Sequence, residues 1–413
     1  MTASGAAFPV PADFPPPPAE ADRVRWDEVD RAARPDRLAR LRARFEGADV
    51  DAYLGVRAAH VRYLTGFELG DGEEAVAGDS GRFLVGRDEI LLMTDSRYAI
   101  EARREAPEAQ VVEVYGDLPV RWPELAARVG ARRIAVEAGY VGHALWDDLA
   151  AAAPDVELVP AGGWLEADRA IKEATEIERI EAACAVADRA LAGLLASIRP
   201  GVTELELALD LEWRMRTGGS DGLAFDVACL AGPEAALPHG SPGHRPVRDG
   251  AVLLFDFGAK VAGYRSDMTR TLFVGDPAAR ELAIYGVVAA AQQAAIAALE
   301  TAARKSAATG APMPSGKEID TIARHVIDAD GRWPAYLHGL GHGIGLATHE
   351  LPTLGRRATD AAIPTPTVFS IEPGIYLEGE TGVRIEDLLV LDADAGTVRS
   401  VTQFPSEVLV VAR

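Results

Sequence analysis

The chain has 413 residues, of which 48% are hydrophobic, enough material for two or three domains with sizeable cores. Its 63 acidic and 42 basic residues leave a net charge of −21 at pH 7, which repels nucleic-acid phosphates and anionic lipids. No uninterrupted apolar run approaches the ~18 residues of a membrane span, and the N-terminus lacks the layout of a secretory signal. We therefore expect a cytoplasmic globular protein that binds neither nucleic acid nor a membrane.

The first 170 residues divide into a proline-rich arm and an α/β domain. Prolines are dense in residues 1–24, which favours extended, poorly packed backbone. In residues 25–170, apolar runs of strand length alternate with helix-like stretches, a pattern that predicts a parallel or mixed sheet. The predicted strands are Asp51–Val56, Arg82–Val85, Glu89–Met93, Gln110–Tyr115 and Arg133–Glu137, and the predicted helices are 35–46, 96–105, 121–130 and 142–153.

Residues 171–413 predict a second domain with an antiparallel or mixed curved sheet and long helices. Apolar residues at helical spacing run from Ile171 to Leu191, and Thr203 and Glu206 form a capping box that opens a helix over 204–216. Two more helices are predicted at 278–304 and 317–329. The predicted strands are Ala251–Phe257, Tyr264–Val274, Val368–Glu372, Val383–Leu391 and Glu407–Ala412.

Two aspartates occur close together in the first part of this domain. Asp256 interrupts an apolar strand, where an unpaired carboxylate is costly, and Asp267 follows with ten residues between the two. Gly258 and Gly263 bracket a connection that can return a second strand beside the first. Two carboxylates on adjoining strands can bind a cation; alternatively, they form hydrogen bonds with turn amides.

A glycine-rich stretch, residues 338–350, contains His338, His342 and His349. Every second position from 339 to 345 is glycine, which excludes the helical His-Glu-x-x-His zinc motif. In an extended chain, even spacing puts His338 and His342 on one face, and we expect the missing side chains to leave room for a ligand. A glycine loop with incidental histidines is the alternative.

Two glutamates interrupt apolar strands further along the chain. Glu372 lies in a strand beside apolar neighbours, and Glu386 lies in the next strand, after a glycine-bearing connection of hairpin length. Strand alternation places Arg384 and Glu386 on the same face. An ion pair on a solvated face would explain Glu386, but it would not explain Glu372.

Together these motifs offer four carboxylates and one imidazole: Asp256, Asp267, His342, Glu372 and Glu386. Such an oxygen-rich set suits Mn, Co, Zn or Fe rather than a thiolate-preferring ion. One divalent ion would leave a residual charge of about −2 among the mutually repelling carboxylates, whereas two would neutralise the site. Two ions ~3.5–4 Å apart would hold a hydroxide near neutral pH and polarise a carbonyl, an arrangement suited to amide hydrolysis.

The spacing of these motifs resembles the metallopeptidase family of aminopeptidase P, prolidase and methionine aminopeptidase, which shares the pita-bread fold with creatinase. The matching segments are Asp-x-Gly, His-Gly-x-x-His, Glu-Pro-Gly and Arg-Ile-Glu-Asp, and the resemblance covers nearly all of residues 171–413. It implies an α+β fold, with a pita-bread C-terminal domain (171–413) and a smaller α/β creatinase-type N-terminal domain (25–170). It also implies that the five residues are metal ligands, with Asp267 and Glu386 bridging two divalent ions per chain, for which we expect manganese before Co, Zn or Fe.

The resemblance assigns roles to neighbouring residues as well. His239 matches a substrate-side histidine, His349 matches one that hydrogen-bonds the substrate and shuttles protons, and Arg384 resembles an arginine that binds the substrate's carboxylate end. His338 is expected on the same wall. Glu372 is the leading candidate for general base.

Two further segments are similar to parts of the family, and one residue departs from it. Three residues resemble support for Asp267, namely Tyr264, Thr269 and Arg270. Residues 94–98 in the first domain are similar to a segment of bacterial Xaa-Pro peptidases that could approach a pocket of the same or a neighbouring subunit. Glu234 stands where relatives often carry Asn, in a region that the resemblance assigns to the amine side of the pocket.

The resemblance thus predicts hydrolysis of the peptide bond before proline, in peptides with proline at the second position, by a homodimer. The motifs leave aminopeptidase P and prolidase undistinguished. A methionine aminopeptidase shares the glycine-rich and His-Glu segments, but Arg384 and the first domain disfavour it. A metal-free creatinase-like hydrolase and a non-catalytic peptide-binding module are also disfavoured, because neither needs all five ligands.

Overall fold

The computed structural model describes residues 14–70 and 76–411, which form two compact units. One unit is Glu20–Asp168, and the other begins at Arg169 and includes the described residues before Glu20. Residues 1–13 of the predicted proline-rich arm lie outside the described residues, and 14–19 form neither helix nor strand. The helix α1 begins at Glu20 with acidic residues in its first turn, so the last residues of the predicted arm are helical.

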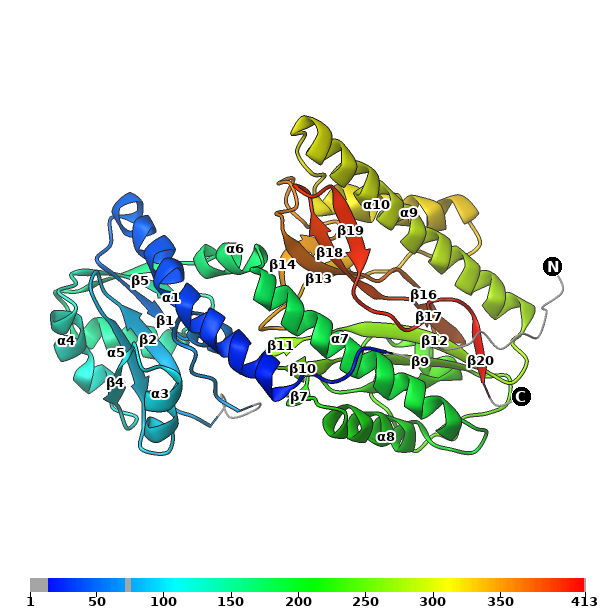
Figure 1. The fold of residues 1–413 in the computed structure, drawn as a ribbon, viewed down its shortest axis with the longest axis horizontal. Helices are drawn as coiled ribbons and strands as arrows, with labels where there is room; N and C mark the ends of the chain where they lie inside the picture. The colour runs from blue at the N-terminus through cyan, green and yellow to red at the C-terminus, as the bar shows by residue number, and fades with distance from the viewer. Residues whose placement is uncertain (1–13, 71–75, 412–413) are drawn as a thin grey trace. The chain divides into compact units, whose positions relative to one another are not determined.

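The first unit contains a mixed six-stranded sheet in the order β4-β3-β2-β1-β5-β6 (Figure 1). Its elements are α1 (Glu20–Ala48), β1 (Ala52–Gly55), α2 (Ala58–Thr65), β2 (Arg82–Val85), β3 (Ile90–Thr94), α3 (Ala99–Glu105), β4 (Gln110–Glu113), α4 (Leu118–Arg128), β5 (Arg133–Glu137), α5 (His143–Ala152), β6 (Glu157–Ala161) and α6 (Trp164–Ala170). All five predicted strands are present. The sequence patterns missed α2, β6 and α6, which are short, and α1 continues through Pro35, where the predicted helix began.

The second unit contains four long helices and several small sheets. Its helices are α7 (Ala174–Leu194), α8 (Glu204–Thr217), α9 (Ala279–Thr309) and α10 (Gly316–Asp330), with short 3-10 turns η2 (Leu195–Ser197) and η3 (Gly232–Ala236). Its strands are β7 (Gly222–Leu223), β8 (Ala228–Ala231), β9 (Val252–Phe257), β10 (Ala259–Val261), β11 (Tyr264–Arg265), β12 (Met268–Val274), β13 (Gly341–Gly343), β14 (Glu350–Leu354), β15 (Thr367–Ile371), β16 (Gly374–Leu377), β17 (Thr381–Arg384), β18 (Asp387–Asp392), β19 (Thr397–Ser400) and β20 (Leu409–Val411).

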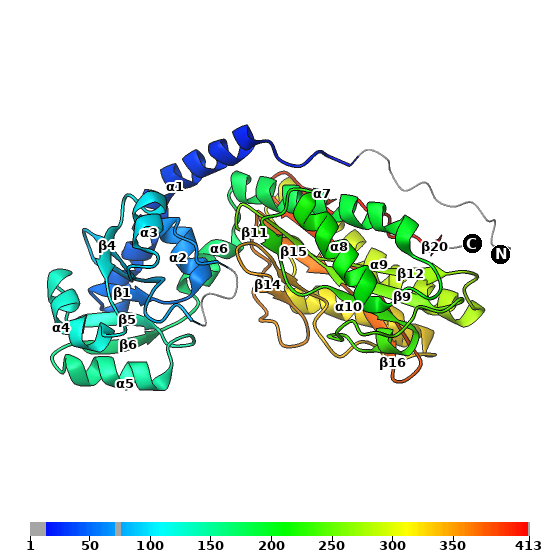
Figure 2. The ribbon, with the colours of Figure 1, turned by 90° about the horizontal axis from the view of Figure 1, so that it is seen from below.

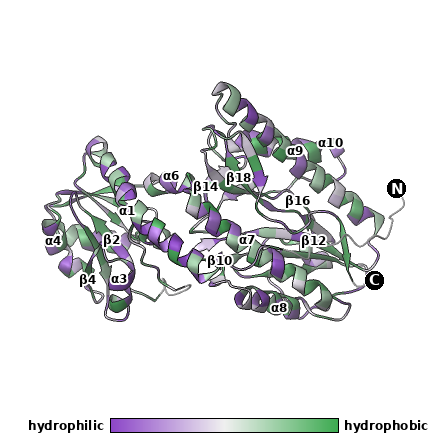
Figure 3. Ribbon diagram, viewed as in Figure 1, coloured by the Kyte–Doolittle hydropathy of each residue, from purple (hydrophilic) through white to green (hydrophobic). Residues whose placement is uncertain are grey.

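Two sheets of this unit carry the residues singled out by the sequence. One has the order β20-β12-β9-β8 and the other β14-β13-β15-β18-β19, and all their pairs are antiparallel except β12 with β20. The helices α7 and α8 lie side by side (Figure 2). Hydrophilic and hydrophobic residues alternate along α7 (Figure 3), as expected for a helix with one buried face. The predicted α+β fold is confirmed.

The helix α9 is long and apolar enough to cross a membrane by length and composition alone. A helix in a protein core passes the same test. In this unit α9 buries one side against the strands, and the buried residues include Ile284, Val288, Ala291, Ala295 and Leu299. The apolar composition of α9 is therefore explained by its packing in the core of this unit.

Three of the predicted acidic ligands lie where strands are interrupted. The predicted strand 264–274 is divided into β11 and β12, with Asp267 in the gap, and the predicted strand 383–391 is divided into β17 and β18, with Glu386 in the gap. Glu372 directly follows the last residue of β15. These three carboxylates therefore lie outside the paired strands, whereas Asp256 and His342 lie within β9 and β13.

Candidate metal centre

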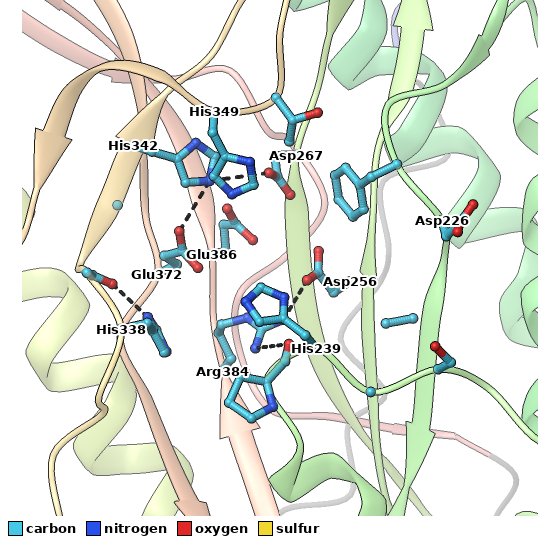
Figure 4. A pocket seen from close by; sticks show the side chains of 18 of the residues that line it. Asp226, His239, Asp256, Asp267, His338, His342, His349, Glu372, Arg384 and Glu386 are labelled. Atoms are coloured by element: carbon cyan, nitrogen blue, oxygen red, sulfur yellow. Dashed lines mark hydrogen bonds and ion pairs between the residues drawn. The ribbon is translucent and has the colours of Figure 1, made fainter. Parts of the chain in front are cut away.

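The five predicted ligands come together from the two sheets. Asp267, His342 and Glu386 each offer a ligand atom, and these atoms lie within 4.8 Å of one another. The His342 Nε2 atom is 3.4 Å from Glu372 Oε1 and 3.6 Å from Asp267 Oδ2. Figure 4 shows the carboxylates of Asp267, Glu372 and Glu386 gathered beside the His342 ring, with Asp256 next to them.

Two oxygens of this cluster are buried without a partner. Asp256 Oδ1 and Glu386 Oε1 accept no hydrogen bond from any described residue. Their companion oxygens are bonded, because Arg384 Nη2 donates to Asp256 Oδ2 at 2.6 Å and Thr269 Oγ1 donates to Glu386 Oε2 at 2.7 Å. Orphaned carboxylate oxygens are costly in a protein interior, and a bound cation would satisfy them. The donor set therefore fits divalent metal.

Burial and mutual repulsion act on the acidic members of the cluster. Burial raises the pKa of Asp267 and of Glu386 well above their ordinary values, and the neighbouring carboxylates raise both further. Burial also raises the pKa of Glu372 to about 7, against the opposing charge of Arg384. Without a cation the cluster therefore retains protons near neutral pH, and bringing cations in must displace them.

The cluster opens into a cavity of about 520 Å³. All five predicted ligands line it, and so do the four other residues predicted to act on substrate, His239, His338, His349 and Arg384. Other lining residues were not predicted for the site, among them Phe225, Asp226, Ala228, Ser241, Thr348 and Thr353. Figure 4 shows Asp226 apart from the acidic cluster. His244 is exposed and does not line the cavity.

Three histidines in the cavity have low basicity. Burial lowers the pKa of His338 and of His349 to about 4, and it lowers the pKa of His342 as well. The rings of His342 and His349 lie 4.1 Å apart, which keeps two imidazoles side by side. Neutral imidazoles have one donor and one acceptor nitrogen, so these rings can accept or donate hydrogen bonds at neutral pH.

Gly339 and Gly341 line the cavity, but a side chain on any of the four glycines between these histidines would meet neighbouring protein atoms rather than open space. The expectation that the missing side chains create the room for a ligand is therefore wrong. A Cβ at Gly341 would lie 1.9 Å from the carbonyl oxygen of Ser370 in β15, and a Cβ at Gly343 would lie 2.0 Å from the carbonyl oxygen of Leu351 in β14. The space is filled by neighbouring main chain. Glycine is required here because β13 lies very close to both of its neighbours.

His338 lies outside β13, so the strand argument that paired it with His342 does not hold. Its Nδ1 atom contacts the carbonyl oxygen of Gly339 at 2.6 Å, and its Nε2 atom contacts the Tyr376 hydroxyl at 2.9 Å. The buried Arg324 of α10 donates to the carbonyl oxygen of His338 at 2.6 Å. The position of His338 therefore depends on the helix α10 and on the β16–β17 hairpin, which are separate elements of the chain.

The residues expected to support Asp267 instead hold other groups. Thr269 bonds the carboxylate of Glu386, and Arg270 donates to the Glu386 carbonyl oxygen and to the Asp387 carboxylate. Tyr264 donates to the Glu176 carboxylate. Because β12 runs beside the break between β17 and β18, its side chains reach Glu386 rather than Asp267.

Arg384 has its donors engaged within the protein. Besides Asp256, its guanidinium donates to Thr269 Oγ1 and to the Tyr376 hydroxyl, both at 2.9 Å. Tyr376 was missed by the sequence analysis, although β16 offers a signal. Gly374 pairs with Arg384 and has no side chain, so Tyr376, two positions along on the same face, can lie across it.

Comparison with known proteins agrees with this geometry. The model of metallopeptidase family M24 matches residues 178–393, and the model of the creatinase/prolidase N-terminal domain matches residues 37–171. The chain belongs to metallopeptidase family M24. The predicted family is thereby confirmed, and the M24 match contains all five predicted ligands.

Individual M24 relatives resemble nearly the whole chain. A Bacillus subtilis protein, the uncharacterized peptidase YqhT, is 32% identical over 375 residues, covering 91% of this chain and 100% of the relative. The structure of an Xaa-Pro dipeptidase from Bacillus anthracis has a TM-score of 0.80 and 30% identity, covering 92% and 100% of the two chains. An X-Pro aminopeptidase structure from Thermotoga maritima has a TM-score of 0.79 and 32% identity, covering 91% and 99%.

Two family-based expectations concern residues outside the acidic cluster of this M24 chain. Glu234 lies in η3, and its Oε2 atom is 3.4 Å from Arg245 Nη2. In residues 94–98, Asp95 accepts hydrogen bonds from Arg97 and Ser80 within the first unit. The approach of that segment to a pocket stays a prediction.

Proposed function

We propose that this M24 metallopeptidase hydrolyses the peptide bond that precedes proline, in peptides with proline at the second position. The observation that carries the proposal is the convergence of four carboxylates and one imidazole in a single cavity. Similar structures named Xaa-Pro dipeptidase and X-Pro aminopeptidase support the preference for proline.

The proposed cofactor is two divalent ions per chain, manganese before cobalt, zinc or iron. Asp256, Asp267, His342, Glu372 and Glu386 would hold them. When bound, such ions polarise a carbonyl and lower the pKa of water. The buried, unpartnered oxygens of Asp256 and Glu386 favour this assignment.

Glu372 is the proposed general base. Its pKa of about 7 in the metal-free chain shows that its surroundings oppose ionisation, and its Oε1 atom faces His342 Nε2 at 3.4 Å. Ser370 Oγ donates to the same oxygen at 3.1 Å, which orients the carboxylate. The carboxylate can then take a proton from the attacking water and pass it to the departing amine.

The histidines are assigned to the substrate side of the cavity. His239 and His349 would hydrogen-bond the substrate carbonyl and the tetrahedral intermediate, and His338 would line the proline side with Arg384. A direct contact between Arg384 and the substrate carboxylate requires the guanidinium to share its donors with Asp256, Thr269 and Tyr376. The same proposal includes a cytoplasmic location. It also includes a homodimer, which light scattering would test.

The test is hydrolysis by the full-length protein loaded with manganese or cobalt. A panel of Xaa-Pro dipeptides and longer Xaa-Pro peptides should include substrates, and Glu372→Ala should abolish turnover. Cleavage of dipeptides alone indicates prolidase, and release of the first residue from tripeptides and longer peptides indicates aminopeptidase P. No cleavage of any member overturns the proposal. Cleavage of Met-Ala peptides instead would indicate a methionine aminopeptidase, and absence of bound metal after loading would indicate a peptide-binding module.

A further inference from the structure

The loop that carries His349 is organised around the carboxylate of the next residue, Glu350. The side chain of Glu350 is only 4% exposed, and its Oε1 atom accepts a hydrogen bond from the backbone nitrogen of Ala347 at 2.7 Å. A Cβ at Gly345 would lie 2.9 Å from the same oxygen. The carboxylate therefore fills the inside of the loop, and its position sets the path of the main chain that leads to His349.

Two buried cations hold this carboxylate. Arg169 Nη2 forms an ion pair with Glu350 Oε1, and Lys172 Nζ lies 3.3 Å from Glu350 Oε2. Lys172 Nζ also donates to the carbonyl oxygen of Arg169, and the Lys172 backbone nitrogen donates to that of Pro366. Burial alone would raise the pKa of Glu350, but the two cations outweigh it and bring the pKa down to about 2. The carboxylate is therefore ionised and fixed from two directions.

This group is poorly suited to a purely structural role. Arg169 and Lys172 are 2% and 1% exposed, so two positive charges are buried against one negative charge. Arg169 Nε and Nη1 are buried without an acceptor among the described residues. Apolar side chains of similar size would avoid both costs. Costly arrangements of this kind are found where a geometry has to be held for function.

We propose that Arg169 and Lys172 are positioning residues of the peptidase site, acting through Glu350 on His349. They keep the His349 ring beside His342, at 4.1 Å, and at the wall of the cavity. Both residues precede the segment matched by the M24 family model, which starts at residue 178. The role rests on the proposed function, because it concerns the histidine assigned to the substrate.

Kinetics of the full-length, manganese-loaded protein test the proposal. Arg169→Met and Glu350→Gln should each lower kcat roughly 10- to 100-fold, with KM changed less than about twofold, because a small displacement of a group that acts in the transition state costs turnover. Arg169→Lys should recover part of the loss. The matched control is Arg37→Met, which removes a buried arginine–carboxylate pair with Asp30 from the first unit and should leave kcat per folded molecule unchanged.

A double-mutant cycle separates positioning from damage to the fold. If Glu350 acts through His349, Glu350→Gln should lower kcat less than about twofold in the His349→Ala background. A full, additive loss in that background overturns the proposal. So does a kcat within twofold of the wild-type value in both single variants.

A measurement that does not use turnover keeps this proposal separate from the proposed function. The ring signals of His349 in metal-free protein can be assigned by comparison with His349→Ala in histidine NMR spectra. Arg169→Met and Lys172→Met should shift these signals and leave those of His143, in the first unit, in place. Unchanged His349 signals overturn the positioning role, whether or not the protein cleaves Xaa-Pro peptides. Failure of the wild-type protein to cleave any such peptide, with shifted signals, overturns the proposed function alone.

Discussion

Arg384 Nη2 donates a hydrogen bond to Asp256 Oδ2 at 2.6 Å, from a guanidinium that is 4% exposed. This contact fixes one oxygen of the carboxylate and leaves Oδ1 directed at the acidic cluster without a partner. The two residues belong to strands of different sheets, β17 and β9. Arg384 therefore orients a predicted metal ligand from a strand that does not pair with the strand carrying that ligand.

Replacing Arg384 should weaken metal binding. Arg384→Met leaves Asp256 free to rotate, and loss of an outer partner of this kind typically costs roughly 10- to 100-fold in metal affinity. Titration of metal-free protein with manganese by calorimetry would measure the change. Arg280→Met, which removes an exposed arginine paired with Glu380, is the control and should bind metal as the wild-type protein does. Equal affinities in the Arg384 and Arg280 variants would show that Asp256 needs no such partner.

Metal affinity should rise with pH between about pH 6 and pH 8. The pKa of Glu372 is raised to about 7, and those of Asp267 and Glu386 are raised well above their ordinary values. A bound cation needs these carboxylates ionised, so protons compete with metal and the affinity falls as the pH falls. Calorimetry in buffers of different ionisation enthalpy would count the protons released. An affinity that is flat over this range, with no proton release, would contradict the raised pKa values.

Gly341→Ala should disrupt the strand that carries His342. The new Cβ would collide with the Ser370 carbonyl oxygen at 1.9 Å, and overpacking of this kind costs roughly 1–3 kcal/mol or more. Gly286→Ala is the matched control, because nothing lies within 4 Å of a Cβ there and the residue is inside α9. In a helix interior this change should stabilise the protein by ~0.5–1 kcal/mol. Denaturant unfolding of the two variants should shift in opposite directions, and a shared direction would refute the assigned contacts.

Arg324→Met should destabilise the loop that carries His338. Arg324 is 6% exposed, pairs with Asp320 at 2.7 Å, and donates to the carbonyl oxygens of Tyr336 and His338. Removing one partner of a buried pair costs about 3–5 kcal/mol. Hydrogen exchange should show faster exchange in residues 336–339. Arg332→Met removes an exposed arginine of the same region and should leave exchange there unchanged; equal effects would rule out a specific role for Arg324.

Much of the architecture could be predicted from local patterns. The capping box of Thr203 and Glu206 is present, with the hydroxyl and the carboxylate each bonded to the other residue's backbone nitrogen. Apolar runs located β1 to β5, β9, β12, β15, β18 and β20, although not every strand, and acidic residues inside those runs marked the predicted ligands. These features depend on residues that are near one another in sequence, so the sequence itself displays them.

The remainder depends on which distant segments become neighbours. Gly341 is needed because of the main chain of Ser370, and Thr269 reaches Glu386 across 117 positions of sequence. The breaks at Asp267 and Glu386 likewise form where two sheets meet. No local pattern reveals such contacts. The alternating glycines were therefore predicted to make room for a ligand, and Thr269 was predicted to support Asp267 instead of Glu386.

The interrupted strands have an evolutionary consequence. Among the described strand ladders, no register includes Asp267, Glu372 or Glu386. The paired strands on either side of each position therefore do not rely on its side chain for their register, although Glu386 accepts a hydrogen bond from Thr269 in β12. A scaffold of this kind can lose the proposed metal ligands one at a time and keep its strand pairing, which offers a physical route from a peptidase to an inactive binding protein.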